Sequence, residues 1–158
     1  GTSMTHHRFE PTAFFNSIGT HPAVLKIASG DTVTAQTVDA HGFDAKGVKA
    51  GDRPNPMTGP FFIEGAEPGD ALQVSIDEIR MTRATGWTFD ILSPNVVDPS
   101  AVSRFPERRK TEWVIDAKKG RAWLAEPPSS LKQWSVAVEP MIGCFGVAPD
   151  LGQAISTA

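Results

Sequence analysis

Glycine and proline break up the whole chain, and their spacing limits what it can fold into. The 158 residues include 14 glycines and 13 prolines, so few stretches are long enough for an uninterrupted helix. β-Branched and other apolar residues collect in short runs between these breaks. The pattern predicts a mainly β protein with few short helices. The expected strands are Ala23–Ala28, Thr32–Asp39, Phe61–Ile63, Ala71–Met81, Trp87–Ile91, Thr111–Asp116, Arg121–Leu124 and Trp134–Val138.

Two of these strands have the same kind of start. The segments that begin at Gly30 and Gly69 both open with Gly-Asp and then alternate between apolar and polar side chains. In the second segment Leu72, Val74 and Ile76 fall on one face of an extended chain, and polar residues fall on the other. A period of two is typical of a half-buried antiparallel strand. Two packed sheets, an antiparallel β-sandwich, are therefore the expected architecture.

Size and charge exclude several classes of protein. A chain of this length is expected to form one domain with its own core. The net charge is -3 and the basic residues are scattered, so the sequence predicts no nucleic-acid partner. No apolar stretch approaches the roughly 20 residues that a membrane-spanning helix needs, so no membrane partner is expected either.

Three further features bear on location, on the chain start and on the number of domains. Cys144 is the single cysteine and cannot form an internal disulfide, which agrees with a cytoplasmic location. Residues 1–3, Gly-Thr-Ser, precede Met4 and resemble an expression scar. Without a shift in composition that would mark a boundary, we predict a single β-rich domain over residues 4–158.

The stretch Asn55–Asp70 sets acids and turn residues around one short apolar run. Phe61–Ile63 is the apolar run, and Glu64 follows it directly at the end of the expected strand. Pro68-Gly69 supplies the fixed φ and the positive φ that a type II turn requires. The stretch therefore predicts a strand that delivers a carboxylate into a turn.

The same stretch resembles a known family. Asn-Pro-x-Thr-Gly-Pro-Phe followed by Glu-Gly-Ala-Glu-Pro-Gly-Asp-x-Leu, between Asn55 and Leu72, is similar to the acetamidase/formamidase family of amide hydrolases. A second block, Glu139–Pro149, resembles the Pro-Met-Ile-Gly-x-x-Gly-Val-Ala-Pro segment of that family. The resemblance implies the β-sandwich N-terminal half of an enzyme that hydrolyses the C–N bond of a small linear amide, such as formamide or acetamide, to a carboxylate and ammonia.

Asp39 and His41 are the candidate metal ligands. Side chains two residues apart in an extended chain point to the same side, so this carboxylate and this imidazole can converge on one ion. Both groups ligate zinc. The alternative is an aspartate that bonds nearby backbone amides beside a solvated histidine. The family resemblance implies that Asp39 belongs to the site, and it implies a divalent metal, with zinc favoured and calcium or another ion as alternatives.

Glu64 is the candidate catalytic residue. It matches the first acid of the family run, and burial at the end of an apolar strand would raise the pKa of its carboxyl group toward the range useful for proton transfer. The alternative is that Glu64 only holds the following turn in shape. Glu67 and Asp70 are assigned to that turn.

Asn55 and Gly143 are the candidate substrate-binding residues. Asn55 lies in a loop before the Glu64 strand, where a short polar side chain can orient a small amide. Gly143 belongs to a glycine-rich segment whose backbone can approach a ligand closely and whose N–H groups can bind an oxyanion. Cys144, in the same segment, is expected to be a small buried hydrophobic residue and not a nucleophile.

The resemblance also implies that the site is incomplete. Family members continue beyond the residue that matches Ala158 with a segment that carries His, Asn and Asp. The expected partner is a second chain with the C-terminal half of the family, or a second copy of this chain in a homo-oligomer. Whether Ala158 is an artificial boundary, the end of a natural subunit or a processing site stays open. A non-catalytic β-rich scaffold or assembly subunit that keeps the family fold is the alternative function.

Overall fold

The computed structural model is built mainly of short strands, as the glycine and proline spacing predicts. It describes residues 4–19, 21–90, 97–104, 106–150 and 152–156. The helical elements described are one α-helical turn, α1, and one 3-10 turn, η2. The elements are β1 (His6–Phe9), β2 (Ser17–Ile18), β3 (Leu25–Ala28), β4 (Thr32–Ala35), β5 (Phe61–Glu64), β6 (Thr85–Phe89), α1 (Pro99–Val102), β7 (Lys110–Asp116), β8 (Arg121–Leu124), η2 (Ser129–Leu131), β9 (Val136–Ala137) and β10 (Ala154–Ile155).

The chain divides into two compact units. The first comprises Gly1–Asp77 and Ile142–Ala158, and the second comprises Glu78–Met141. All five residues predicted for the functional site belong to the first unit. The single β-rich domain expected over residues 4–158 stays a prediction.

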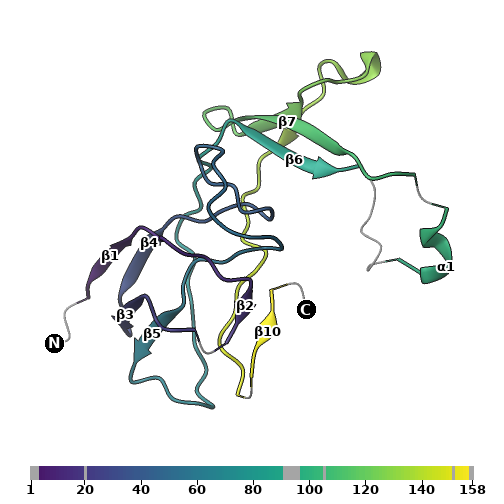
Figure 1. Ribbon diagram of the computed structural model, residues 1–158. Helices are drawn as coiled ribbons and strands as arrows, with labels where there is room; N and C mark the ends of the chain where they lie inside the picture. Colours follow the sequence, from purple (N-terminus) through teal and green to yellow (C-terminus); the bar gives the residue numbers. More distant parts are fainter. Residues whose placement is uncertain (1–3, 20, 91–96, 105, 151, 157–158) are drawn as a thin grey trace. The chain divides into compact units, whose positions relative to one another are not determined.

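Three two-stranded sheets form the first unit (Figure 1). β1 pairs with β4, and β3 pairs with β5, in parallel, whereas β2 pairs with β10 in antiparallel. Parallel pairs need a long connection between their strands, and residues 29–60 connect β3 to β5. The antiparallel prediction is therefore wrong for two of these pairs, because alternation reveals which face of a strand is covered and not the direction of its neighbour. The sheets are small and open, so the β-sandwich stays a prediction.

The two Gly-Asp starts form the same turn. The N–H of Asp31 donates to the carbonyl oxygen of Ala28 at 3.0 Å, and the N–H of Asp70 donates to that of Glu67 at 3.0 Å. In return each aspartate accepts the N–H of the first turn residue through Oδ2, at 3.0 and 2.9 Å. Gly30 and Gly69, the third residues of the turns, have φ of 89° and 94°. The predicted turn at Pro68-Gly69 is confirmed, and so is the turn role of Glu67 and Asp70.

Of the two segments that follow these turns, only the first forms a paired strand. The first is β4, which pairs with β1. The second was expected over Ala71–Met81, but no strand pairing involves it within the described residues. Leu72, Val74 and Ile76 are 46%, 47% and 55% exposed. The strand prediction fails here because an alternating segment forms a strand only where a neighbouring segment bonds to its backbone.

The second unit holds one antiparallel sheet with the order β6-β7-β8-β9. β8 has the predicted bounds, β6 and β7 differ from prediction by one or two residues, and β9 is shorter. Ile91, the predicted end of the β6 strand, lies outside the described residues. Trp113 on β7 contacts Trp134, with ring centroids 5.9 Å apart.

The described residues of the two units include no fully buried hydrophobic core. In the part of the chain that the structure describes, every hydrophobic side chain keeps some exposure to solvent, and His41 is the single buried polar residue. The described helices are both too short to cross a membrane.

Asp31 ties β1 to the rest of the first unit and makes its stability depend on pH. Its carboxylate lies 2.8 Å from His7 Nε2 and accepts the N–H groups of Ala28 and Thr5 at 3.0 Å. The His7 hydrogen bond, followed by the bonds from Ala28 and Thr5, lowers the pKa of Asp31 from 3.8 to about 2. A carboxyl group whose pKa falls on folding stabilises the folded state above its unfolded pKa, and this stability disappears as the pH falls.

We therefore expect wild-type stability to drop between pH 3.8 and about 2, and Asp31→Asn to remove this part of the drop. Urea unfolding at several pH values measures both. Asp77→Asn is the control, because Asp77 is exposed. Parallel stability curves for wild type and Asp31→Asn across this range would contradict the assignment.

Candidate functional site

Asp39 begins the first of two tandem loops with the same hydrogen bonds. Asp39 Oδ1 accepts the N–H groups of His41 and Phe43 at 2.9 and 3.0 Å, and its carbonyl oxygen accepts that of Gly42 at 2.9 Å. Asp44 makes the same three bonds in the second Asp-Ala-x-Gly unit of the sequence. Its Oδ1 accepts the N–H groups of Lys46 and Val48, and its carbonyl oxygen accepts the N–H of Gly47. The amide-bonding alternative for Asp39 is therefore observed. The metal-ligand role of Asp39 stays a prediction.

The two loops differ in how tightly they pack. His41 in the first loop is buried, with 8% of its surface exposed, whereas the equivalent Lys46 is exposed. Gly42 has φ of 91°, and a Cβ built on it would lie 1.9 Å from the carbonyl oxygen of Gly51. Gly47 has φ of 74°, and a Cβ there would meet nothing within 4 Å. Only the first loop, Asp39–Phe43, is thus enclosed by its surroundings.

Asn55 lies directly beside the Asp39–Phe43 loop. Its N–H donates to the carbonyl oxygen of Ala40 at 2.9 Å, and its φ of 47° is in the left-handed region, which asparagine tolerates better than most residues. Cis peptide bonds precede Pro54 and Pro60 on either side of it. The structure therefore brings the predicted substrate-binding residue, Asn55, next to the loop that carries the two predicted metal ligands.

The glycine-rich segment is linked to the same loop. The thiol of Cys144 donates to the carbonyl oxygen of Ser156 at 3.2 Å, and the Ser156 hydroxyl donates to that of Pro54 at 3.3 Å. Pro54 is the residue directly before Asn55. A Cβ on Gly143 would meet nothing within 4 Å, so the backbone at this residue is open to a small molecule. Cys144 is partly buried and held by this bond.

A serine and a histidine form a close pair in this region. Ser17 Oγ lies 2.8 Å from His21 Nε2 in a partly buried position. The His21 ring stacks on Phe15, with centroids 4.0 Å apart and planes at 18°. Phe15 exchanges two backbone hydrogen bonds with Met57, of 3.1 and 2.8 Å, so the pair adjoins the loop that carries Asn55.

Glu64 lies in a different environment from the one its sequence predicts. It ends β5 opposite Ala28 of β3, its side chain is 52% exposed, and its carboxylate is 3.3 Å from Lys26 Nζ. The expected burial is not observed, because β3 covers only the edge of β5 and leaves the side chain in solvent. An exposed ion pair of this kind adds little stability. The catalytic role of Glu64 stays a prediction.

The described residues do not form a complete metal site by themselves. No group of three or more His, Cys, Asp or Glu side chains among them could hold a metal ion. Asp39 and His41 are suitable donors for zinc, but Asp39 Oδ1 already accepts two amide hydrogens. Any metal held here requires ligands from elsewhere.

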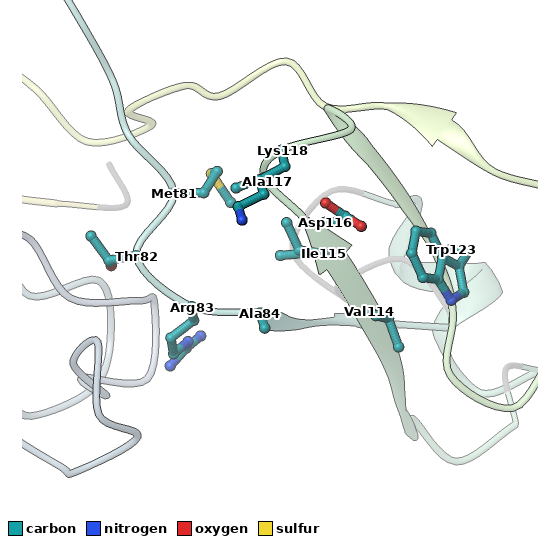
Figure 2. A pocket seen from close by; sticks show the side chains of 10 residues that line it. All are labelled: Met81, Thr82, Arg83, Ala84, Val114, Ile115, Asp116, Ala117, Lys118 and Trp123. Atoms are coloured by element: carbon teal, nitrogen blue, oxygen red, sulfur yellow. The ribbon is translucent and has the colours of Figure 1, made fainter.

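The second unit has a pocket of its own. Its volume is about 390 Å³, and it is lined by residues 81–84 and 114–118 together with Trp123. Figure 2 shows Arg83, Lys118 and Asp116 around it among apolar side chains. None of the five predicted site residues lines this pocket.

Sequence reasoning missed the Ser17–His21 pair. Its only local signal is the spacing, since the two residues are four positions apart. That spacing implies contact only in a helix, and here β2 and the bend after it bring the side chains together.

Comparison with known proteins gives one match. A family model described as "Acetamidase/Formamidase family" matches residues 11–153, which include all five predicted site residues. No match was found among curated proteins or among solved structures. The resemblance seen in the Asn55–Leu72 and Glu139–Pro149 motifs is thereby confirmed.

Proposed function

Since the chain belongs to the acetamidase/formamidase family, we propose that it hydrolyses the C–N bond of a small linear amide, with formamide and acetamide as the first substrates to consider. Membership of the family implies amide hydrolase chemistry in general. The reaction adds the elements of water across the C–N bond and releases a carboxylate and ammonia.

The observation that carries this proposal is the meeting of three separate segments in the first unit. The Asp39–Phe43 loop, Asn55 and the Gly143 segment are joined by hydrogen bonds through Ala40, Ser156 and Pro54. An enclosed imidazole, a loop asparagine and an open glycine backbone suit a small, uncharged amide, which needs orientation more than charge pairing.

Asp39 and His41 are the residues that would hold a divalent metal, with zinc favoured and calcium or another ion as alternatives. Carboxylate and imidazole are ordinary zinc ligands, and such an ion polarises a carbonyl group. The proposal requires further ligands beyond these two. The role of this chain is to hold Asp39 and His41 in a fixed loop beside Asn55.

We assign proton transfer to Glu64. Its support is the match to the family run and its place at the end of β5. The exposed position beside Lys26 means that Glu64 needs cover from another polypeptide segment to work in a water-poor site.

The uncovered segment Ala71–Asp77 supports the proposal of a partner polypeptide. It follows a Gly-Asp turn equal to the one before β4, and its apolar side chains alternate, yet no described segment pairs with it. An exposed strand of this kind binds another strand readily. The partner is a second chain with the C-terminal half of the family, or a second copy of this chain.

One experiment tests the amidase activity, the need for a partner polypeptide and the role of Glu64. Ammonia release from formamide and acetamide is measured for the purified protein, alone and with the C-terminal half, while light scattering gives the mass of each sample. We expect turnover only in an assembled species, and we expect Glu64→Gln to reduce it by about 100-fold, the lower range for a general acid or base. Glu67→Gln is the matched control, because Glu67 is an exposed acid that belongs to the turn. Absence of turnover from every assembled sample would favour the scaffold alternative, and unchanged turnover in Glu64→Gln would remove Glu64 from the site.

A further inference from the structure

We propose that Ser17 and His21 are a nucleophile and its base, and that amide hydrolysis in this protein passes through an ester on Ser17. This inference rests on the proposed function, because it takes the same small amide as substrate. It assigns to the chain a covalent step that the Asp39, His41 and Glu64 assignments do not contain.

The first support is the geometry of the pair. A separation of 2.8 Å between Ser17 Oγ and His21 Nε2 is within the range for proton transfer between nucleophile and base. β2 holds Ser17 by pairing it with Ile155 of β10, and Figure 1 shows these two strands side by side. Stacking on Phe15 fixes the plane of the imidazole. Both side chains are therefore positioned before any substrate binds.

The second support is the location of the pair. Phe15, which stacks on the His21 ring, exchanges backbone hydrogen bonds with Met57, and Met57 is two residues after Asn55 along the chain. On the other side, a Cβ on Gly146 would lie 3.0 Å from the side chain of Ile18, so the glycine-rich segment passes close to β2. The residues next to the pair, Phe15 and Ile18, thus each contact one of the two segments to which substrate binding is assigned.

The chemistry balances without any added reactant except water. The Ser17 hydroxyl donates its proton to His21 Nε2 as Oγ attacks the amide carbon. His21 then gives the proton to the leaving nitrogen, the C–N bond breaks, and ammonia leaves an ester on Ser17. Water next gives a proton to His21 and attacks the ester carbon. The C–O bond to Ser17 breaks, the proton returns to Oγ, and the carboxylic acid is released and loses its remaining proton to solvent as it becomes the carboxylate.

The competing explanation is that Ser17 only anchors the His21 ring to β2. The two roles differ in what a reactive phosphorus reagent detects. A serine activated by a base reacts with diisopropyl fluorophosphate, whereas a structural serine hydroxyl does not.

The assembled, purified protein is treated with diisopropyl fluorophosphate, and the labelled residue is identified by peptide mass spectrometry. We expect one label on Ser17, no label in Ser17→Ala, and labelling at least 100-fold slower in His21→Gln, whose amide can keep the hydrogen bond but cannot take the proton. Ser130→Ala, in an exposed part of the second unit, should label like wild type. Absence of label on Ser17 in wild type overturns the proposal, and so does equal labelling in His21→Gln.

Amide turnover separates this proposal from the proposed function. Turnover that survives in Ser17→Ala overturns the covalent step and leaves the amidase assignment standing. Labelling of Ser17 that depends on His21, in a protein that turns over no amide, supports the pair and rejects the amidase assignment.

Discussion

Alanine at position 42 is expected to destabilise the protein by about 4 kcal/mol or more, because two costs coincide there. The φ of 91° lies in the region that L residues with a Cβ avoid, and the new Cβ would lie 1.9 Å from the carbonyl oxygen of Gly51. The Asp39–Phe43 loop and the segment around Gly51 must therefore separate. Urea unfolding of Gly42→Ala against wild type measures the loss.

Gly47→Ala is the matched control for this change. Gly47 occupies the same place in the second tandem loop, with φ of 74°, and a Cβ there meets nothing within 4 Å. Only the backbone cost remains, and it amounts to about 1 kcal/mol. Equal losses in the two variants would show that the contact with Gly51 does not exist in solution.

Asp39→Asn is expected to reduce amide turnover by about 100-fold, the size of effect that a displaced or missing site group causes. The amide oxygen of asparagine can still accept the N–H groups of His41 and Phe43, so the loop should keep its shape. What disappears is the negative charge that a bound cation needs. Steady-state ammonia release, with unfolding curves recorded in parallel, measures both properties.

Asp44→Asn gives the comparison that separates the two roles of an aspartate in such a loop. Asp44 makes the same hydrogen bonds as Asp39, but its loop is more exposed. The amide turnover of the Asp44→Asn variant should stay within about twofold of wild type, as for an ordinary surface substitution. If both asparagine variants are fully active, Asp39 has a loop role alone and the metal assignment loses its only carboxylate.

The sequence predicted the local structure well wherever a few neighbouring residues decide it. The Pro68-Gly69 turn closes as expected, because proline fixes one φ, glycine permits the next, and Asp70 accepts an amide three residues back. The strands Arg121–Leu124 and Thr111–Asp116 were predicted to within a residue. Each lies between glycine-containing or proline-containing breaks that end it on both sides.

The candidate site was predictable only in part. Asp39, His41, Asn55 and Gly143 were chosen from short motifs, and the structure joins their segments through hydrogen bonds. Glu64 was expected to be partly buried and is exposed. Its burial depends on which segments cover β5, and no motif around Glu64 contains that information.

The sequence by itself determined the family of this protein and the chemistry of its turns, because both reside in residues adjacent along the chain. The repeated Gly-Asp turns and the Asn55–Asp70 run belong to this category. Only the tertiary structure decided the parallel direction of β1–β4 and β3–β5, the exposure of Ala71–Asp77 and the meeting of Ser17 with His21. Strand direction and burial depend on contacts between distant segments, and the free energy of those contacts leaves no periodic signal in either segment alone.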